Sequence, residues 1–453
     1  MMEVRGKKFS VIGGARSGIA VALLLHEHGA RVFVSDTATR EQLAHAIAAF
    51  ERHGIGYECG GNTERLLDAD VLVLSPGVPL DLPIVRLARE KAIRVVGEIE
   101  VASWFCTGTI VAITGTNGKT TTTALTGRMF EDARRPVVVA GNIGNAFSEV
   151  VRSMTPQHTA VLEVSSFQLD TIRMFAPRVA VLLNITPDHL DRYGNSMERY
   201  TASKCRVFMN QREGDTVVYN ADDPIVRTNV ERLAPSGVRR FPFSLSTSLP
   251  EGAWIRNNTM VVRMDGRERT VIGVEEISIK GVHNLINAMA ATLAAKALSI
   301  PTASLRATLR NFKGVEHRLE FVRELRGVTF VNDSKATNVD AVWYALQSFS
   351  QPIVLLLGGR DDKNDYSRLF PLVQKHVRAI VAIGESAGKV VATFAPLKLV
   401  AQASSMREAV QQAASLAHPG DVVLLSPACK SFDWFENFEH RGRVFKAEVM
   451  ALT

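Results

Sequence analysis

The stretch GTNGKTT at residues 115–121 decides the fold of the central part of this chain. Before it, the apolar and β-branched run 109–114 predicts a buried strand, and after it the apolar spacing over 122–130 predicts a helix. A glycine loop between a strand and a helix is typical of a phosphate-binding loop, because free N–H groups and the helix dipole point at the anion. We therefore expect Lys119 to reach the outer phosphates of a nucleoside triphosphate and Thr120 to hold Mg²⁺.

The loop is a shortened form of the usual pattern, since Ile113 stands where a glycine normally lies five residues before the second glycine. The alternative interpretation is an ordinary strand-to-helix turn with a solvated lysine. The coincidence of a strand, a Gly-Lys-Thr sequence and a helix argues against that alternative. The sequence therefore predicts that the chain binds a nucleoside triphosphate.

Length and composition bound the class of protein. A chain of 453 residues suggests about three domains, and 46% hydrophobic with 22% charged residues is typical of a globular protein with ample core. The net charge of +7 is modest and no basic run is present, so small anionic substrates fit and nothing supports nucleic-acid binding. The four cysteines lack metal-ligand spacing, and neither a signal peptide nor a membrane span is visible. We expect a monomeric cytoplasmic protein without membrane or nucleic-acid partners.

The N-terminal part reads as the opening of a dinucleotide-binding fold. Residues 5–36 predict a strand, a glycine turn, a helix and a second strand. Ala15 replaces the middle glycine of the G-x-G-x-x-G pattern, so close approach of a pyrophosphate to this turn is in doubt. A further strand at 71–74 ends at the turn 75–77, on the sheet edge where ligands of such folds bind. The pattern favours a nucleotide-sized pocket but is a weak NAD fingerprint.

The rest of the chain alternates strand and helix patterns, which predicts an α/β protein with mostly parallel sheets. A small β patch is expected over 239–280, and an alanine-rich buried helix near 284–298. The expected strands of the middle part include 137–140, 159–163 and 179–183. Those of a second dinucleotide-like fold are 328–331, 353–357, 379–383 and 422–425. Breaks in the pattern divide the chain into three domains, 1–97, 98–314 and 315–453.

Polar residues follow two strands of the expected middle sheet. Glu163 ends one strand, and the next strand runs into Asn184, Asp188 and His189. Carboxylate, hydroxyl and imidazole groups at the carboxyl ends of parallel strands suit Mg²⁺ and phosphate chemistry. Glu163 and His189 are therefore candidate metal-site residues. The alternative for His189 is a helix-capping or core histidine.

Other polar residues have both a functional and a plain structural interpretation. Asn142 lies in a turn, and Lys204 would ordinarily be a solvated helical lysine. Asn284 and Asn287 share a helix face and could bind a nucleobase or cap the helix. In the third domain, basic and hydroxyl groups that follow strands suggest a carboxylate-bearing substrate. These groups lie at 332–338, 358–363 and 426–432.

With these motifs in order, the chain resembles the Mur ligase family over essentially its whole length. Besides the phosphate loop, the motifs are GNIG (141–144), LEVSSFQLD (162–170), LNITPDHLDRY (183–193), YTASK (200–204), GVHNLINA (281–288), HR (317–318), NDSKATN (332–338) and SPACKSFDWFENFEHRG (426–442). The SSFQL, DHLDRY, NDSKATN and SPACxSxDxFxxFxxRG strings are typical of the members that add D-glutamate. Sister ligases share only the ATP-binding motifs.

The resemblance implies an ATP-dependent amide ligase of peptidoglycan precursor synthesis. ATP would phosphorylate the alanyl carboxylate of UDP-N-acetylmuramoyl-L-alanine, and the D-glutamate amine would then displace phosphate from the acyl phosphate. The three domains would bind the UDP substrate, ATP and the amino acid, in chain order. Two Mg²⁺ ions and Lys119 would offset charge on the transferred phosphoryl group.

The resemblance also assigns roles to individual residues. The catalytic residues would be Lys119, Glu163, His189 and Lys204; Lys204 is expected to be carbamylated, which requires a neutral amine and therefore a lowered pKa. Metal ions would lie at Thr120, Glu163, His189 and Lys204. ATP would contact Gly115, Thr116, Asn117, Gly118, Lys119, Thr120, Thr121, Asn284, Asn287, Arg318 and Asp333. The UDP substrate would contact Ser17, Asp36, Thr37, Ser75, Gly77, Asn142 and His189. D-glutamate would contact Thr337, Lys363, Ser431 and Phe438.

Two departures from the family pattern matter. Ala38 stands where some members carry an arginine for the UDP phosphates, and Arg16 or Arg40 could replace it. The glycine segment before Lys363 is longer than in the family, which makes the equivalence of this lysine less direct.

Sequence features oppose three alternative functions. A sister amide ligase, such as a folylpolyglutamate synthase, is opposed by the N-terminal domain, which the folate enzymes lack. A nicotinamide-dependent oxidoreductase is opposed by Ala15 and by the phosphate loop. A nucleotide-binding regulator without catalysis is opposed by Glu163, His189 and Lys204, which mere binding does not need.

Overall fold

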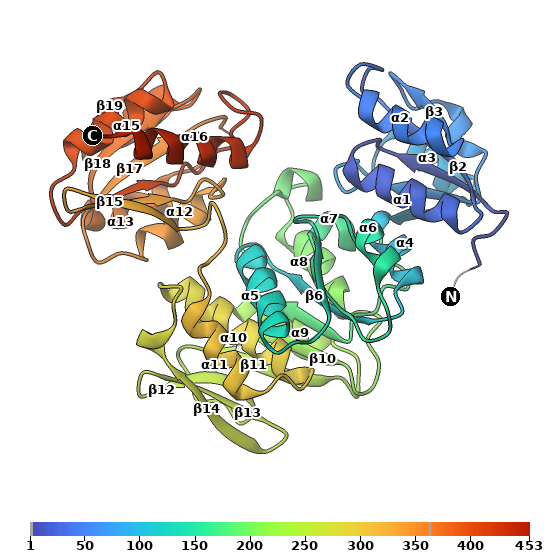
Figure 1. Cartoon of the computed structure of the whole chain (residues 1–453), viewed down its shortest axis with the longest axis horizontal. Helices are drawn as coiled ribbons and strands as arrows, with labels where there is room; N and C mark the ends of the chain where they lie inside the picture. Colours follow the sequence, from blue (N-terminus) through green and yellow to red (C-terminus); the bar gives the residue numbers. More distant parts are fainter. Residues whose placement is uncertain (1–2, 362–363) are drawn as a thin grey trace. The chain divides into compact units, whose positions relative to one another are not determined.

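The structure, a computed structural model, describes residues 3–361 and 364–453 (Figure 1). The packing divides the chain into two compact units, Met1–Gly273 with Ala288–Thr308, and Val274–Asn287 with Leu309–Thr453. Two sheets lie in the first unit and one in the second. The predicted D-glutamate contact Lys363 lies outside the described residues.

The first sheet has five parallel strands. Its elements are β1 (Lys8–Ile12), α1 (Arg16–Glu27), β2 (Arg31–Asp36), α2 (Ala44–His53), β3 (Gly56–Cys59), β4 (Val71–Leu74), α3 (Pro83–Glu90) and β5 (Arg94–Gly97). The strand order is β3-β2-β1-β4-β5, so the winding direction reverses between β1 and β4. This confirms the predicted dinucleotide-fold opening, whose ligands bind at such a reversal.

The second sheet has nine strands. Its strands are β6 (Thr109–Thr114), β7 (Val137–Gly141), β8 (Thr159–Glu163), β9 (Val179–Leu182), β10 (Thr216–Asn220), β11 (Arg239–Ser244), β12 (Gly252–Arg256), β13 (Thr259–Met264) and β14 (Arg267–Gly273). The helices around it are α4 (Glu98–Phe105), α5 (Lys119–Asp132), α6 (Phe147–Val150), α7 (Ser166–Leu169), α8 (Met197–Cys205) and α9 (Pro224–Leu233). Helices α10 (Val282–Ala297) and α11 (Thr302–Asn311) complete the middle part of the chain.

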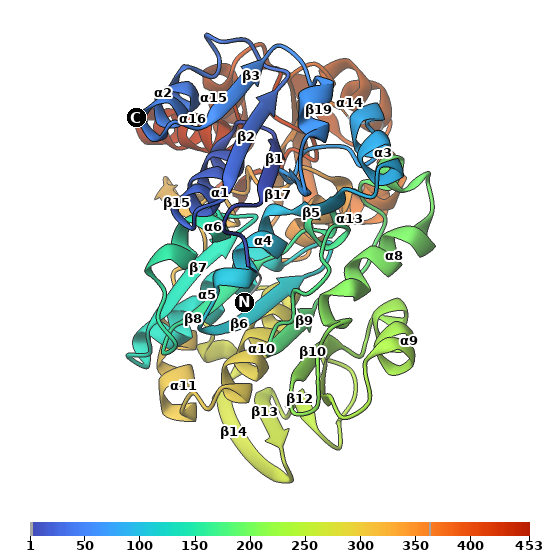
Figure 2. The same cartoon turned by 90° about the vertical axis from the view of Figure 1, so that its right-hand side faces the viewer.

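The order of this sheet is β14-β13-β12-β11-β10-β9-β6-β8-β7, and the run β7, β8, β6, β9, β10 is visible in Figure 2. Strands β6 to β12 pair with one another in parallel, whereas β13 is antiparallel to both β12 and β14. The short strands predicted over 239–280 are present, and they extend the main sheet. The central strand β6 therefore lies between β8 and β9, which both carry predicted site residues at their ends.

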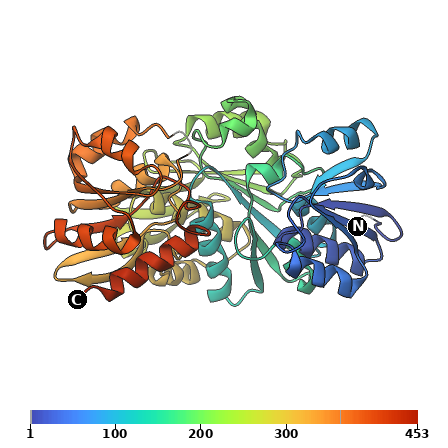
Figure 3. The same ribbon diagram turned by 90° about the horizontal axis from the view of Figure 1, so that it is seen from above.

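The third sheet has six strands. Its elements are β15 (Glu320–Leu325), β16 (Val328–Asn332), α12 (Val339–Leu346), β17 (Ile353–Gly358), α13 (Phe370–His376), β18 (Val377–Ile383), α14 (Ala387–Phe394), β19 (Leu399–Gln402), α15 (Met406–Leu416), β20 (Val422–Leu425) and α16 (Phe438–Ala451). The order is β15-β16-β20-β17-β18-β19, with only β15 antiparallel, at the edge. Helices α12 to α14 share one core with the sheet, and α15 and α16 share the other. The last two helices are the red ones in Figure 3. The Rossmann-like third domain predicted from the sequence is thus present.

Short 3-10 helices connect these elements: η1 (Glu64–Leu67), η2 (Val151–Ser153), η3 (Leu190–Tyr193), η4 (Arg206–Phe208), η5 (Val274–Glu276) and η6 (Ser367–Leu369). In the part of the chain that the structure describes, no helix combines the length and the apolar character that crossing a membrane requires.

The buried strands explain why the predicted site residues gather at strand ends. Strands β8 and β9 are buried along their whole length, and β6 from its second residue onward. Such strands of a parallel sheet are covered on both faces and carry apolar residues. Polar side chains are therefore left to the carboxyl ends, where Thr114 ends β6 and Glu163 ends β8.

Candidate active site

The phosphate loop is held in shape by a glycine and by the segment after β9. Gly115 has φ +153°, and a Cβ there would lie 2.9 Å from a side-chain carbon of that segment, so only glycine fits. Asn184 anchors the loop: its carbonyl oxygen accepts the Thr116 N–H at 2.9 Å, and its side-chain oxygen accepts the Asn117 N–H at 2.8 Å. These two hydrogen bonds and the Gly115 backbone therefore hold the loop in its shape.

Several hydrogen-bond donors lie at this loop, as the binding of a phosphate group requires. Helix α5 begins at Lys119 after Gly118, and no side chain in the described part of the chain caps it, so its first-turn N–H groups face the loop. The Lys119 Nζ donates to the carbonyl oxygens of Gly115 and Thr116 at 3.0 and 2.7 Å. The Asn117 Nδ2 is buried and has no hydrogen-bond partner among the described residues. An anionic ligand would satisfy these groups together.

Glu163 joins the predicted metal-site residues to the loop. Its carboxylate is 2% exposed and accepts the Thr120 hydroxyl at 2.7 Å and the Asn142 side-chain amide at 3.0 Å. Gly141 makes this approach feasible, since a Cβ there would lie 2.3 Å from the Glu163 carbonyl oxygen. A carboxylate and a hydroxyl side by side at a phosphate loop are the hard oxygen ligands that suit Mg²⁺.

His189 is neither of the alternatives considered for it. Its side chain is 47% exposed, which excludes a core histidine, and among the described residues it makes no capping hydrogen bond at the start of η3. The backbone has φ +51°, and the ring packs edge-on against Phe167 at 5.1 Å between centroids. The Nε2 lies 3.7 Å from a carboxylate oxygen of Asp188. The imidazole is therefore accessible to a ligand.

Lys204 is buried, not solvated as an ordinary helical lysine would be. Its side chain is 2% exposed, its Nζ donates to the Gly115 carbonyl at 2.8 Å, and it lies 4.5 Å from the Tyr200 ring centroid. Burial, followed by the nearby charge of Lys119, holds the pKa of Lys204 well below its usual value. The structure thus brings this amine to the phosphate loop in a form that favours the neutral state.

Five of the predicted UDP-substrate residues (Ser17, Asp36, Thr37, Ser75 and Gly77) lie at or after the carboxyl ends of β1, β2 and β4 in the first sheet. The Asp36 carboxylate accepts the backbone N–H groups of Gly14 at 2.6 Å and Ala38 at 2.8 Å, which fixes the two loops after β1 and β2. The Ser75 hydroxyl donates to the Gly13 carbonyl at 3.2 Å. Of the remaining candidates, Ser17 is half-buried in the first turn of α1, and Thr37 and Gly77 are exposed.

Arg318 and Asp333 lie together in the second unit. The Arg318 Nη1 is 4.0 Å from the Asp333 carboxylate, which also accepts the Ser426 hydroxyl at 2.9 Å. The Arg318 Nε is buried without a hydrogen-bond partner in residues 3–361 and 364–453. Asn284 and Asn287 share a helix face as predicted, and the Asn287 amide donates to the Asn284 side-chain oxygen at 3.3 Å.

Asp333 should make the stability of the protein depend on pH. Burial, opposed by the charge of Arg318, raises the pKa of Asp333 from 3.8 to about 6. Between these values the folded chain holds a proton that the unfolded chain releases, so the free energy of unfolding falls as pH rises. Because Asp333→Asn lacks this effect, its unfolding free energy relative to wild type should increase by on the order of 3 kcal/mol from about pH 4 to pH 7. Denaturant titrations at these pH values test this, and a constant difference would contradict it.

The described D-glutamate residues follow strands of the third sheet. Thr337 lies after β16 and is half-buried, Ser431 lies after β20 and is 2% exposed, and Phe438 begins α16. A residue outside the predicted set ties these loops together. Arg441, 1% exposed, donates to the Ser334 hydroxyl at 2.9 Å and to the Cys429 carbonyl at 3.0 Å.

The sequence reasoning missed the roles of Arg441 and Asn184. Both lie inside quoted motifs, so a signal was present, but a motif does not say which member contacts ligand and which supports the loop. The structure brings Lys119, Thr120, Asn142, Glu163 and Lys204 to one loop.

Three family models match the chain. They are the MurD-like N-terminal domain of Mur ligases over residues 7–97, the Mur ligase middle domain over 113–295 and the Mur ligase glutamate ligase domain over 317–429.

Curated relatives match the whole chain. The chain is 50% identical to UDP-N-acetylmuramoylalanine–D-glutamate ligase of Salinibacter ruber, with 99% of each chain covered. It is 45% identical to the ligase of the same name from Chloroherpeton thalassium, again over 99% of each chain.

Solved structures show the same fold at low identity. The chain resembles the UDP-N-acetylmuramate-alanine ligase MurC of Thermotoga maritima with a TM-score of 0.60 and 20% identity, covering 98% of this chain and 99% of that one. It resembles the MurF ligase of Thermotoga maritima in complex with ADP with a TM-score of 0.59 and 19% identity, covering 99% and 96%.

Proposed function

We propose a reaction from one premise: this chain belongs to the Mur ligase family, and within it to the ligases that add D-glutamate in peptidoglycan precursor synthesis. Ligases of this family use ATP. The observation that carries the ATP-dependent step is the phosphate loop held by Asn184, with Lys119 over it and the Thr120–Glu163 pair at its end.

A carboxylate is a poor electrophile until one of its oxygens becomes part of a leaving group. In the first step an alanyl carboxylate oxygen of UDP-N-acetylmuramoyl-L-alanine attacks the γ-phosphorus of ATP, and ADP leaves. In the second step the D-glutamate amine attacks the acyl carbon, inorganic phosphate leaves from the tetrahedral intermediate, and the amine loses a proton. Lys119 holds the phosphates in line, and its charge offsets the charge that moves to ADP.

Magnesium fits the residues around Glu163. We assign Thr120, Glu163, His189 and carbamylated Lys204 as the residues that would hold two Mg²⁺ ions; bound there, the ions supply charge neutralisation of the phosphates. Asn142 orients the Glu163 carboxylate through its amide and, with His189, borders the muramoyl substrate. The other loop residues, Gly115, Thr116, Asn117, Gly118 and Thr121, surround the phosphates.

Residues of the second unit would also bind ATP and the amino acid. Asn284 and Asn287 would contact the base, and Asp333 and Arg318 the ribose and phosphates. The Arg318 Nε, which has no hydrogen-bond partner among the described residues, supports this. The remaining residues would bind D-glutamate: Thr337, Lys363, Ser431 and Phe438. We further propose domain boundaries at 97/98 and 314/315, a monomeric state and a cytoplasmic location.

Arg16, and not Arg40, should replace the family arginine missing at Ala38. Arg40 is paired with Glu51 at 3.3 Å, whereas Arg16 is exposed at the first position of α1, where N–H groups favour a diphosphate. We expect Arg16→Ala to raise KM for the UDP substrate about tenfold and Arg40→Ala to change it by less than about twofold. Initial-rate kinetics with the UDP substrate varied tests this, and the reverse ranking would assign the contact to Arg40.

The proposed reaction is tested by phosphate release from ATP in the presence of UDP-N-acetylmuramoyl-L-alanine. D-glutamate should support release, whereas L-glutamate, L-lysine and meso-diaminopimelate should not. Release with one of the other amino acids would keep the fold and mechanism but contradict the D-glutamate assignment. No release with any of them would contradict the ligase proposal.

A further inference from the structure

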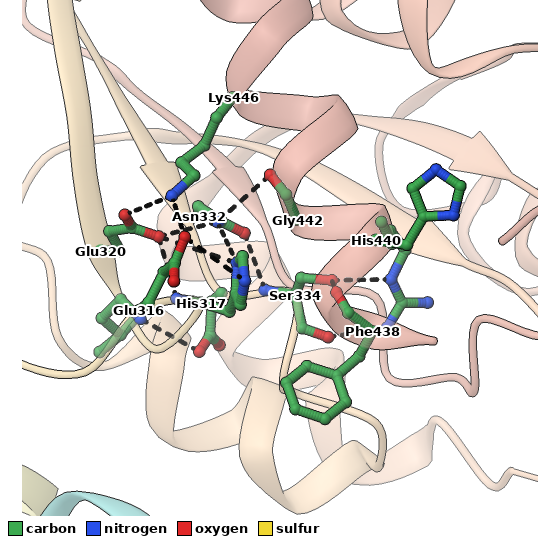
Figure 4. A network of polar contacts seen from close by, with 12 residues as sticks. Glu316, His317, Glu320, Asn332, Ser334, Phe438, His440, Gly442 and Lys446 are labelled. Carbon is green, nitrogen blue, oxygen red and sulfur yellow. Dashed lines mark hydrogen bonds and ion pairs between the residues drawn. The ribbon is translucent and has the colours of Figure 1, made fainter. Parts of the chain in front are cut away.

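A polar network on helix α16 holds the turn that carries Arg318. Figure 4 shows Lys446 reaching from α16 to Glu316 and Glu320, which lie on either side of this turn. The Lys446 Nζ donates to a carboxylate oxygen of Glu316 at 2.5 Å and to one of Glu320 at 2.9 Å. One ammonium group therefore joins the two ends of the segment.

The turn between these two carboxylates has an unfavourable backbone conformation. His317 has φ +65° and Leu319 has φ +44°, in the left-handed region that non-glycine residues rarely adopt. Such residues keep this conformation only where surrounding contacts hold them in it. The contacts that hold this turn therefore also determine where Arg318 lies.

Glu320 is the central acceptor in those contacts. Its second carboxylate oxygen accepts the His317 N–H at 2.9 Å and the Asn332 side-chain amide at 2.9 Å. The same Asn332 amide nitrogen lies 2.9 Å from the His317 Nδ1. The carboxylate thus carries Lys446 on one oxygen and the backbone of the turn on the other.

This turn also contacts two residues that are assigned to ATP and D-glutamate, Asp333 and Phe438. The Leu319 N–H donates to the Asp333 carboxylate at 3.2 Å, next to Arg318. The buried His317 ring packs edge-on against Phe438, and a Cβ at Gly442 would lie 2.2 Å from that ring. Helix α16 therefore packs closely against the His317 ring.

The same cluster has the ligand atoms of a metal site, because Glu316, His317 and Glu320 each offer one within 4.8 Å of the others. Lys446 already lies on both carboxylates and supplies the positive charge itself. Burial lowers the pKa of Lys446, but its two carboxylate hydrogen bonds outweigh this and raise the pKa overall, so the group stays charged. A divalent cation would have to displace a well-bound ammonium, so the cluster is better described as an internal ion network.

We propose that Lys446 is a positioning residue for nucleotide binding: by joining Glu316 to Glu320 it keeps the intervening turn in the form that presents Arg318 beside Asp333. This inference rests on the proposed role of Arg318 toward ATP. The Lys446 ammonium contacts Glu316 and Glu320, and it acts through the backbone of the turn.

The test compares Lys446→Met with Lys446→Arg in the full-length enzyme. Methionine keeps the length and the helix propensity of lysine but removes the charge. We expect Lys446→Met to raise KM for ATP about tenfold with kcat and KM for the UDP substrate within about twofold. Lys446→Arg, which can still bridge two carboxylates, should recover most of the ATP affinity.

An ion pair between α16 and its neighbour α15 offers a matched control variant. Arg407 of α15 pairs with Glu448 of α16 at 3.2 Å on the exposed surface, and Arg407→Met should leave all three constants unchanged. Thermal unfolding of each variant checks that the second unit stays folded.

Calorimetric binding of ADP separates this inference from the proposed function. If the wild type binds ADP but shows no D-glutamate-dependent turnover, the proposed function fails, and the loss of ADP affinity in Lys446→Met still tests the network. If Lys446→Met binds ADP as tightly as wild type, or if Lys446→Arg is as defective as Lys446→Met, the positioning role is wrong.

Discussion

Replacing Lys119 by methionine should lower kcat/KM for ATP by about a thousandfold or more. The Nζ of Lys119 lies over the loop, within 3.0 Å of two backbone oxygens, where an incoming phosphate would find the positive charge. Charge moves from the γ-phosphate toward ADP as the bond breaks, and Lys119 stabilises that charge more in the transition state than in the ground state. The loss should therefore fall mainly on kcat.

The matched control for this variant is Arg128→Met on the same helix. Arg128 is exposed and forms an i,i+4 pair with Asp132, so its removal changes charge without touching the loop. Phosphate release at varied ATP measures both variants, and Arg128→Met should stay within about twofold of wild type. A Lys119→Met enzyme that kept a tenth of wild-type activity would contradict the assigned role of Lys119.

Replacing Lys204 by methionine should reduce turnover by about a hundredfold or more, because it removes a group that supports the metal ions. A neutral lysine amine adds CO₂ to give a carbamate anion and releases one proton. Lys204 meets that requirement, since burial beside Lys119 lowers its pKa well below the usual value. The carbamate turns a nitrogen donor into an oxygen ligand of the kind that Mg²⁺ prefers.

Dependence on CO₂ distinguishes the carbamate from a plain amine. Wild-type activity should fall when the enzyme is equilibrated in buffer stripped of CO₂ and recover when bicarbonate is added, whereas Lys204→Met should respond to neither. Arg199→Ala, an exposed change on the same helix α8, should behave as wild type. A wild-type enzyme indifferent to bicarbonate would contradict carbamylation, and a fully active Lys204→Met would contradict any role of this residue.

Most of the local structure could be predicted from the sequence. The strands at 109–114, 71–74 and 422–425 are found where the apolar runs placed them. This success has a physical reason, because a fully buried parallel strand needs a continuous apolar run and its flanking turns need glycine or polar residues. The phosphate loop was equally visible, since its glycines are required by backbone geometry at that point.

The strand order could not be predicted. Nothing local to β6 says that its neighbours are β8 and β9 and that β7 is not adjacent, because each parallel crossover can place the next strand beside or beyond the last. The joining of β11 to β14 to the main sheet was missed for the same reason.

For the candidate site too, the sequence identified individual residues but not their surroundings. Motifs identified Lys119, Glu163 and Asp333 by residue type and position at strand ends. They could not show that Lys204 is buried, that His189 is half-exposed, or that Arg441 holds two loops, because burial depends on what the rest of the chain places against each side chain.

The sequence by itself determined the α/β class, the order of the three domains and the ligand chemistry of the strand ends, since periodicity and motifs act over a few residues. Only the tertiary structure decided which of those groups meet. Asn184 contacts the phosphate loop across 67 residues of chain, and Lys446 contacts Glu316 across 130. Contacts between residues so far apart in the sequence depend on strand order and on the packing of helices against sheets. The lowered pKa of Lys204 depends on the burial that this packing creates.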